Sequence, residues 1–446
     1  DSTAIVDADF INFSNVEVLQ LNGASTAVLG TEAQQAGFST IVTGDGNTDL
    51  TIGGFPVTID ASAMDAADTL TIRGTGAITI SGLVAQLTSY ATGALTISTD
   101  ANATQTIRFE ASPTGTLTLG GAESIHLATG VDLSALTITG SASYELTLDA
   151  NAAVSMTVDQ HNAATAINAA GTTDQITLTT AGTLTGDADV ETYVLATAGG
   201  STFTLGSASQ NVTTGGGGDT LNVSTYTATG TFNTVNADTI QLGTGANISG
   251  VQAEGAAAGT ALDADHLTID SGASVSMTVA QHNAFTGTIT AAGSETITFT
   301  DAGTATGLSA IEAYNLAAGT NTFTLGAASQ NVTTSSGAIT VNTGAIGDIT
   351  DSAINGTNAT SLAIVLGATS DISDAVITGT TGTRDTNYTI TLDGFDSTLT
   401  IAQNALITSA SGAGNTVTLA DAGTATGNAA IEAYNLAAGT NTFTLG

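Results

Sequence analysis

Short runs of alternating apolar and polar residues recur along the whole chain. Apolar residues alternate with threonine at residues 70–72, 77–80, 95–97, 136–138 and 297–299, as in Leu70-Thr71-Ile72. This period of two, with β-branched residues, is typical of strands that bury one face. Gly, Asn, Asp, Ala and Ser lie between these runs and favour turns. The pattern predicts short strands about every 8–12 residues.

Three segments interrupt this alternation and predict one or two helical turns each, at residues 30–38, 84–90 and 279–285. They carry Ala, Gln or Leu and end near an aromatic residue. Helices this short are unstable alone, so we expect them to lie against strands and close a coil.

A long repeat underlies the strand pattern. Glu191, Glu312 and Glu432 stand in matching contexts 121 and 120 residues apart. Residues 154–162 return as residues 275–283, and residues 399–404 are a diverged third copy. We therefore predict diverged repeats at 1–150, repeats at 151–296 and 297–416, and the start of a further repeat at 417–446. Because the last copy stops partway, we expect the sequence to be part of a longer chain.

Two all-β folds are compatible with this pattern, namely chained sandwiches and a parallel β-solenoid. Sandwiches use longer strands and commonly an aromatic core, whereas this chain lacks Trp and is only 4% aromatic. Short strands, small corner residues and stacked aliphatic residues favour the solenoid, or β-helix. At roughly 20 residues per coil, one long repeat would form about six coils.

The charge of the chain limits the classes of molecule that it is expected to bind. Charged residues make up 9%, there is no Lys, and the net charge of −36 comes from 39 acids against three arginines. So few cations argue against nucleic acid and against anionic membrane surfaces. With almost no internal counter-charges, the protein should attract cations. It has no Cys, and no apolar run approaches the length of a membrane span.

Candidate metal ligands are Asp45, Asp49 and Asp219, which lie in Gly-rich corners where carbonyl oxygens could converge. Calcium takes six to eight such oxygen ligands. The alternative is that each aspartate hydrogen-bonds its own turn. Asp263, Asp265 and His266 form a further acidic cluster.

The recurring His161 and His282 are interpreted as packing or capping residues, since no second His stands at zinc-site spacing. The recurring glutamates are given structural roles, such as capping a strand, binding cations or facing a neighbouring subunit. They are Glu17, Glu123, Glu191, Glu312 and Glu432. No nucleophile motif, dinucleotide fingerprint or phosphate loop occurs, and Gly215–Gly218 lacks the Lys of a phosphate loop. We therefore predict no enzymatic activity.

The Val-Glu-x-Leu-x-Leu segment at 16–21, the Thr-Val-Ala-Gln-x-x-x-Phe segment at 278–285 and the Asn, Asp and Gly corners carry a family resemblance. The chain resembles large bacterial surface-layer proteins, and is similar to type I-secreted adhesins and repeats-in-toxin proteins. The resemblance implies an extracellular β-rich protein with calcium-dependent order and self-assembly. Residues 214–221 match the repeats-in-toxin calcium motif except at Thr214, whereas the matching corner at 334–339 has no Asp.

The expected function is a self-assembling extracellular protein of a surface layer, sheet or filament, stabilised by Ca²⁺ and partnered by other copies of itself. A cell-surface polysaccharide would be bound through parts of the protein outside this sequence. One alternative is the passive stalk of a secreted adhesin. Another is a β-helical polysaccharide-degrading enzyme, which the scarcity of Arg and Lys disfavours.

Overall fold

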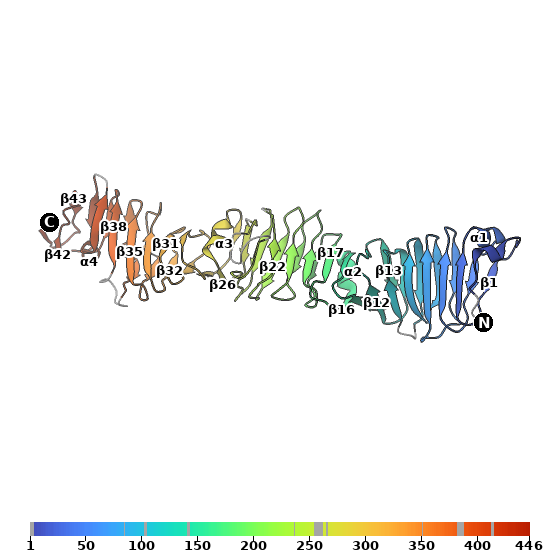
Figure 1. The fold of residues 1–446 in the computed structure, drawn as a ribbon. Helices are drawn as coiled ribbons and strands as arrows, with labels where there is room; N and C mark the ends of the chain where they lie inside the picture. The colour runs from blue at the N-terminus through green and yellow to red at the C-terminus, as the bar shows by residue number, and fades with distance from the viewer. Residues whose placement is uncertain are drawn as a thin grey trace. The chain divides into compact units, whose positions relative to one another are not determined.

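The computed structural model describes residues 4–83, 85–101, 105–140, 143–235, 237–253, 262–264, 266–349, 351–380, 388–411 and 414–446. These residues form two compact units, Asp1–Asp219 and Thr220–Gly446. Each unit consists of short parallel strands stacked coil upon coil, as Figure 1 shows for the strands of the first unit. The prediction of an all-β parallel solenoid is confirmed.

Along residues 18–148 of the first unit, successive strands alternate between two sheets, so that each coil there gives one strand to each sheet. The seven-stranded sheet contains β1 (Val18–Gln20), β3 (Thr40–Val42), β5 (Val57–Asp60), β7 (Ile78–Leu83), β9 (Ala94–Thr99), β11 (Thr114–Leu119) and β13 (Leu136–Gly140). The eight-stranded sheet contains β2 (Ser25–Leu29), β4 (Thr48–Ile52), β6 (Thr69–Gly74), β8 (Gln86–Ala91), β10 (Thr106–Phe109), β12 (Glu123–Leu127), β14 (Tyr144–Leu148) and β16 (Ala164–Ala169). The unit continues with β15 (Ala153–Met156), β17 (Gln175–Leu178), β18 (Thr183–Thr185), β19 (Thr192–Val194), β20 (Thr202–Thr204) and β21 (Asn211–Thr213).

The second unit repeats this construction with further short strands. They are β22 (Thr220–Ser224), β23 (Phe232–Asn233), β24 (Thr239–Leu242), β25 (His266–Ile269), β26 (Ser274–Met277), β27 (Ile289–Thr290), β28 (Thr296–Phe299), β29 (Thr304–Thr306), β30 (Ala313–Asn315), β31 (Asn321–Thr324), β32 (Asn331–Thr333), β33 (Ala338–Asn342), β34 (Ala353–Asn355), β35 (Ser361–Leu366), β36 (Ser370–Asp371), β37 (Val376–Thr378), β38 (Thr389–Asp393), β39 (Ser397–Leu399), β40 (Ile407–Ser411), β41 (Thr416–Leu419), β42 (Thr424–Thr426), β43 (Ala433–Asn435) and β44 (Thr442–Thr444).

The core of the first unit is a ladder of aliphatic side chains in strict register. Ile41, Ile59, Ile80, Ile97 and Leu117 pair in succession on neighbouring strands, and each is at most 1% exposed. The residues between them along each strand face outward, because successive side chains of a strand point to opposite faces. Burying one such side chain contributes about 1.5–3 kcal/mol. The alternation seen in the sequence is therefore the inside and outside of a coil.

The coils vary in length around the predicted value. Ile80 and Ile97, paired on adjacent coils, are 97 − 80 = 17 residues apart. Leu29 and Ile52 are also paired and are 52 − 29 = 23 residues apart. Since the strands stay short, the additional residues lie in the corners.

Helical turns occur at two of the three predicted places. The described residues contain the 3-10 helix η1 (Asp7–Phe10) and the helices α1 (Thr31–Ala36), α2 (Val158–Ala163), α3 (Val279–Ala284) and α4 (Ile401–Asn404). Helices α1 and α3 confirm the predictions at 30–38 and 279–285. The predicted turn at 84–90 is wrong: Val84 lies outside the described residues, and Gln86–Ala91 form strand β8. Pairing with β6 and β10 on both sides prevails there over a weak local helix preference.

Helices α2, α3 and α4 share one device that ties them to the coil. The Thr278 hydroxyl accepts from the backbone N–H of Gln281, and the Gln281 side chain accepts from the N–H of Thr278, which is a capping box. The side-chain amide of Gln281 also donates to the Ile248 carbonyl at 2.8 Å and is fully buried. Gln160 and Gln403 make the same bonds, the first to Leu133 and Leu136, the second to Ile372. One glutamine therefore satisfies both the start of a helix and carbonyls inside the coil.

Replacing Gln281 with Ala should lower the free energy of unfolding by about 2–4 kcal/mol, because a buried N–H and a buried carbonyl lose their hydrogen-bond partner. Urea unfolding followed by circular dichroism would measure this. The control is Ala280→Asp, which places at an exposed position the residue found at Asp159 in the preceding copy; its effect should stay within about 0.5 kcal/mol. Similar effects of both changes would contradict a special role for the glutamine.

Candidate functional site

The three aspartates predicted as metal ligands have three different surroundings. Asp45 lies at an exposed corner before β4, Asp49 lies on the outward face of β4, and Asp219 is buried at the end of the first unit. They do not come together in one site.

Asp45 is the one of the three that joins an acidic cluster. Carboxylate oxygens of Asp45, Asp65 and Asp68 lie within 4.8 Å of one another. Among the described residues, these three form the group of acidic, His or Cys side chains that is close enough together to hold a metal ion. The backbone N–H groups of Asp65 and Gly46 both donate to Asp68, at 2.9 and 3.0 Å, and lower the pKa of its carboxyl group. The corner thus holds three carboxyl groups close together at the surface, an arrangement that could take a cation with oxygen ligands.

Sequence spacing concealed two members of this cluster. Asp65 and Asp68 follow Asp45 by 20 and 23 residues, which is one coil of the solenoid. Counting one coil forward from each acidic corner would have found them. We call Asp45, Asp65 and Asp68 the acidic corner.

Asp49 has a different partner. Its carboxylate forms an ion pair with Arg73 on the next strand of the eight-stranded sheet, and both side chains are about two-fifths exposed. Exposed pairs of this kind stabilise a fold little. Asp49 also lines a hollow of about 460 Å³ on the outer surface of that sheet.

Asp219 links neighbouring coils through hydrogen bonds to backbone groups. Its two carboxylate oxygens accept from the backbone N–H groups of Ser201, at 2.6 Å, and of Gly215, at 2.8 Å, and its side chain is fully buried. At Gly215 a Cβ atom would clash with the Ala196 carbonyl oxygen of the preceding coil. The Gly-rich run that resembles a calcium motif is thus also required for close stacking of coils.

The recurring glutamates also bond to backbone groups. Glu191 accepts from the N–H of Asp174 at 2.8 Å, and Glu312 accepts from the N–H of Glu295 at 3.0 Å. Glu123 is buried and accepts from the N–H of Gly121 at 2.9 Å. These bonds agree with a structural role at the start of a strand. Glu17 and Glu432 are exposed.

The repeated histidines face tyrosines on a later coil. His161 Nε2 lies 3.1 Å from the Tyr193 hydroxyl, and His282 Nε2 lies 3.3 Å from the Tyr314 hydroxyl. In the third copy Asn404 occupies the histidine position, and its Oδ1 accepts from the Tyr434 hydroxyl at 3.1 Å.

The protonation of these histidines follows from their neighbours. The Tyr193 and Tyr314 hydroxyl oxygens each accept a backbone N–H, so their protons point to the histidine Nε2, which accepts. The acceptor Oδ1 of Asn404 in the third copy has the same polarity. Burial lowers the pKa of both His161 and His282. At neutral pH the two rings are therefore uncharged, this polarity places the proton on Nδ1, and the rings serve packing and hydrogen bonding.

The remaining predicted cluster is only partly described. Asp265 lies outside the described residues. Within them, His266 begins β25 and accepts from the backbone N–H of Thr288 at 2.7 Å through Nδ1.

No helix among the described residues is long and apolar enough to span a membrane.

The buried histidines predict a dependence of stability on pH. Their folded pKa lies below the ordinary value of 6.5, so their contribution is complete above that value and is lost as the pH falls below it toward the folded pKa. Each histidine contributes a limiting slope of about 1.4 kcal/mol per pH unit. Urea unfolding between about pH 7.5 and 5.5, above the range of ordinary carboxyl groups, should show falling stability.

The control is the double variant His161→Asn and His282→Asn, which copies the residue of the third repeat. It keeps an acceptor for each tyrosine and removes the titrating group. Its stability should change less across the same pH range. A slope equal to that of the unmodified protein would show that other groups cause the dependence.

Comparison of the chain with protein-family models, with curated proteins and with solved structures gives no match.

Proposed function

We propose that this chain is a structural, self-assembling extracellular protein. Copies lie side by side in a bacterial surface layer, sheet or filament, and Ca²⁺ stabilises them. The observation that carries the proposal is a column of uncharged hydroxyl side chains on the outward face of the seven-stranded sheet.

That column consists of threonines in strict register on six successive strands. It contains Thr40, Thr58, Thr79, Thr96, Thr116 and Thr137. All six are partly or fully exposed, and no charged residue interrupts them. A second column beside it brings Thr118 and Thr139 together, with their hydroxyl oxygens 3.2 Å apart. We call the first column the threonine face.

The second unit carries a comparable column on the sheet that contains β26. It contains Ser276, Thr298, Asn315, Thr333, Asn355 and Thr378. The Asn315 amide donates to the Thr298 hydroxyl at 3.1 Å. Both units therefore present uncharged groups that can donate and accept hydrogen bonds.

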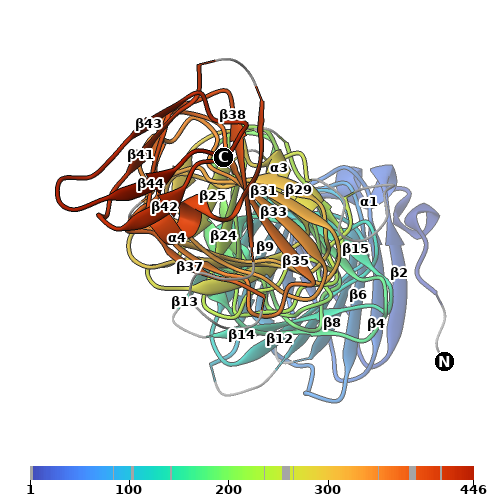
Figure 2. The same cartoon turned by 90° about the vertical axis from the view of Figure 1, so that its left-hand side faces the viewer.

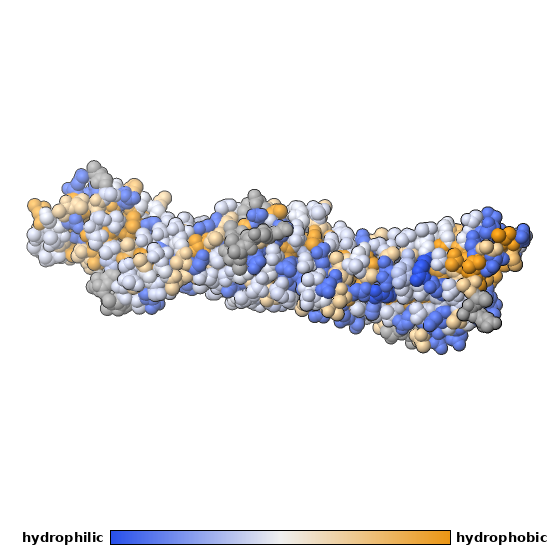
Figure 3. Space-filling model, in the orientation of Figure 1, coloured by the Kyte–Doolittle hydropathy of each residue, from blue (hydrophilic) through white to orange (hydrophobic). Residues whose placement is uncertain are grey.

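Such columns suit lateral contact between copies. Hydroxyl and amide groups can pair across an interface without the cost of removing ions from water. A regular parallel sheet also repeats its outward groups about every 4.8 Å, so one favourable contact recurs along the column. Much of the visible surface has intermediate hydropathy, as expected where threonine, serine and glycine predominate (Figure 3).

The charge of the protein supports a role for cations. A net charge of −36 would make neighbouring copies repel each other unless cations lie between them. The acidic corner offers three carboxyl groups to such an ion. Calcium is the ion we propose, because it accepts carboxylates, backbone carbonyls and water in flexible geometry.

Charging the threonine face tests the lateral contact. The double variant Thr96→Glu and Thr116→Glu should fold, because both side chains point outward, and should not form the ordered layers or filaments that we expect of the unmodified protein with Ca²⁺. Negative-stain electron microscopy would show this. The control is Thr106→Glu and Ser124→Glu, which adds the same charge to the outward face of the other sheet. Assembly by the first variant would contradict the proposal, as would the absence of assembly by the unmodified protein.

Removing the acidic corner tests the role of the ion. Ca²⁺ should raise the melting temperature of the unmodified protein, because a ligand that binds only the folded state stabilises it. Asp45→Asn with Asp65→Asn should abolish that increase, and EDTA should reverse it. Asp159→Asn is the control, since the next copy has Ala280 at this position. Equal calcium effects in both variants would place the ion elsewhere.

A further inference from the structure

The two arginines that the structure describes lie on the same sheet. Arg73 belongs to β6 and Arg108 to β10, both in the eight-stranded sheet of the first unit. A chain with 39 acidic residues thus carries these cationic side chains on one outward surface. Their surroundings differ in a way that distinguishes a structural arginine from an accessible one.

Arg108 is occupied by internal partners. Its guanidinium donates to both carboxylate oxygens of Asp149, at 2.7 and 2.5 Å, and to Glu110 at 2.5 Å. These bonds raise the pKa of Arg108 and lower that of Asp149. Bidentate pairing of this kind fixes the side chain. Arg108 therefore ties coils together.

Arg73 is accessible by comparison. It pairs with Asp49 on β4, and its guanidinium carbon lies 4.7 Å from the centre of the Tyr90 ring on β8. Strands β4, β6 and β8 are consecutive neighbours in the sheet (Figure 2). All three side chains alternate with buried residues along their strands and therefore point outward. Tyr90 is 41% exposed and the Arg73 side chain equally so. We call Asp49, Arg73 and Tyr90 the Arg73 face.

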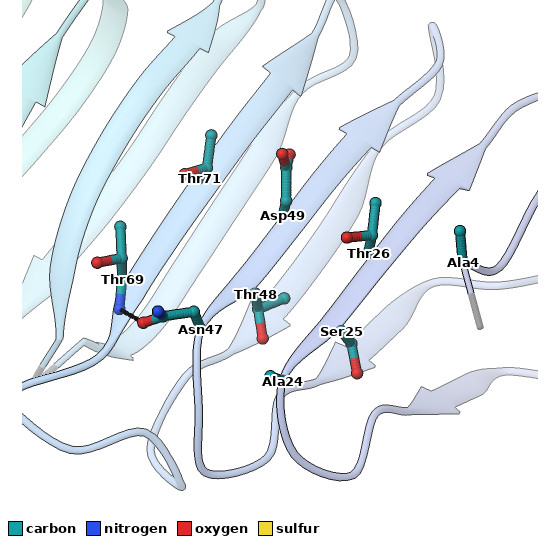
Figure 4. A pocket seen from close by; sticks show the side chains of 9 residues that line it. All are labelled: Ala4, Ala24, Ser25, Thr26, Asn47, Thr48, Asp49, Thr69 and Thr71. Atoms are coloured by element: carbon teal, nitrogen blue, oxygen red, sulfur yellow. Dashed lines mark hydrogen bonds between the residues drawn. The ribbon is translucent and has the colours of Figure 1, made fainter. Parts of the chain in front are cut away.

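A hollow of about 460 Å³ adjoins this face at Asp49. Its lining includes Thr26, Asn47, Thr48, Thr69 and Thr71. Thr26, Asp49 and Thr71 occupy one register position on neighbouring strands and point to the same side (Figure 4). The surface is therefore an aromatic–guanidinium stack next to a depression rich in hydroxyl and carboxylate groups.

From this arrangement we infer that the Arg73 face and the hollow bind a neutral polysaccharide. Sugar hydroxyls donate and accept hydrogen bonds, and the Asp49 carboxylate, the Asn47 amide and threonine hydroxyls offer both kinds of partner. The C–H face of a sugar ring packs on flat surfaces such as the Tyr90 ring and the Arg73 guanidinium. A concave site with a few convergent polar groups is typical of ligand recognition.

The charge of the protein favours neutral polysaccharides over acidic ones. The one accessible arginine of this surface already has a carboxylate partner. A polyanion would approach a protein of net charge −36 against long-range repulsion. A neutral polymer meets no such barrier.

This binding site is independent of the proposed self-assembly. Lateral contact uses the threonine face on the seven-stranded sheet, whereas the Arg73 face lies on the eight-stranded sheet. Loss of one activity would leave the other measurable, so the two proposals fail separately.

The test is electrophoresis of the whole protein in native gels that contain soluble polysaccharides. The neutral panel is dextran, yeast mannan, soluble starch and xyloglucan, and the acidic panel is alginate and polygalacturonate. At least one neutral polymer should retard the protein more than either acidic one. Tyr90→Ala and Asp49→Asn should each weaken that retardation about 10-fold in apparent affinity. Tyr90→Phe should keep most of it.

Thr106→Ala, on the outward face of β10 in the same sheet, is the matched control and should bind like the unmodified protein. Circular dichroism confirms that each variant is folded. If no neutral polymer of the panel retards the protein, the inference is wrong. It is equally wrong if an acidic polymer binds as strongly, or if folded Tyr90→Ala and Asp49→Asn bind as the unmodified protein does.

Discussion

Every part of this protein depends on hydrogen bonding from one coil to the next. A parallel strand in a solenoid does not pair with the strand that directly follows it in the sequence. Strands of the preceding and the following coil must therefore supply the hydrogen-bond partners of its backbone N–H and C=O groups. The strands achieve this directly, as in the pairing of Ile59 with Ile41 and Ile80. At the corners, where strands end, side chains complete the bonding. Asp174 accepts from Ala152 and Gly171, and Gln330 donates to the Leu308 and Ile311 carbonyls.

This constraint explains residues that otherwise resemble functional groups. Asp219 stands in a glycine-rich motif, but both its oxygens bond to backbone N–H groups. His161 recurs with the repeat, and its ring completes a bond to a buried tyrosine. A buried polar group without a partner costs about 1–3 kcal/mol, so a repeat that stacks must carry such residues at fixed positions. Recurrence in a solenoid is therefore evidence of stacking before it is evidence of chemistry.

The same constraint decides what the sequence could predict. Alternation such as Leu70-Thr71-Ile72 reflects which side chains of a single strand are buried and which face outward. This property is local in the sequence, so the strands and the solenoid were predictable. The strand at Gln86–Ala91 was not, because pairing on both sides prevails over its local helix preference. Sites made across coils were also hidden: Asp45 meets Asp65 and Asp68 one coil later, and Arg73 meets residues 24 positions before and 17 after it. Their spacing equals a coil length, but coils differ in length, so an average length does not say which residue of the next coil each one meets.

Since stacking determines the interior, recognition has to lie in the outward columns. The two sheets of the first unit carry different columns: uncharged threonines on one, and an ion pair, an aromatic ring and a hollow on the other. A column repeats its groups at the strand spacing of about 4.8 Å, which favours extended partners that repeat as well. Weak contacts made in series become strong through effective concentration. A surface of shallow, repeated contacts therefore suits a lattice of copies or a polymer better than a single small molecule.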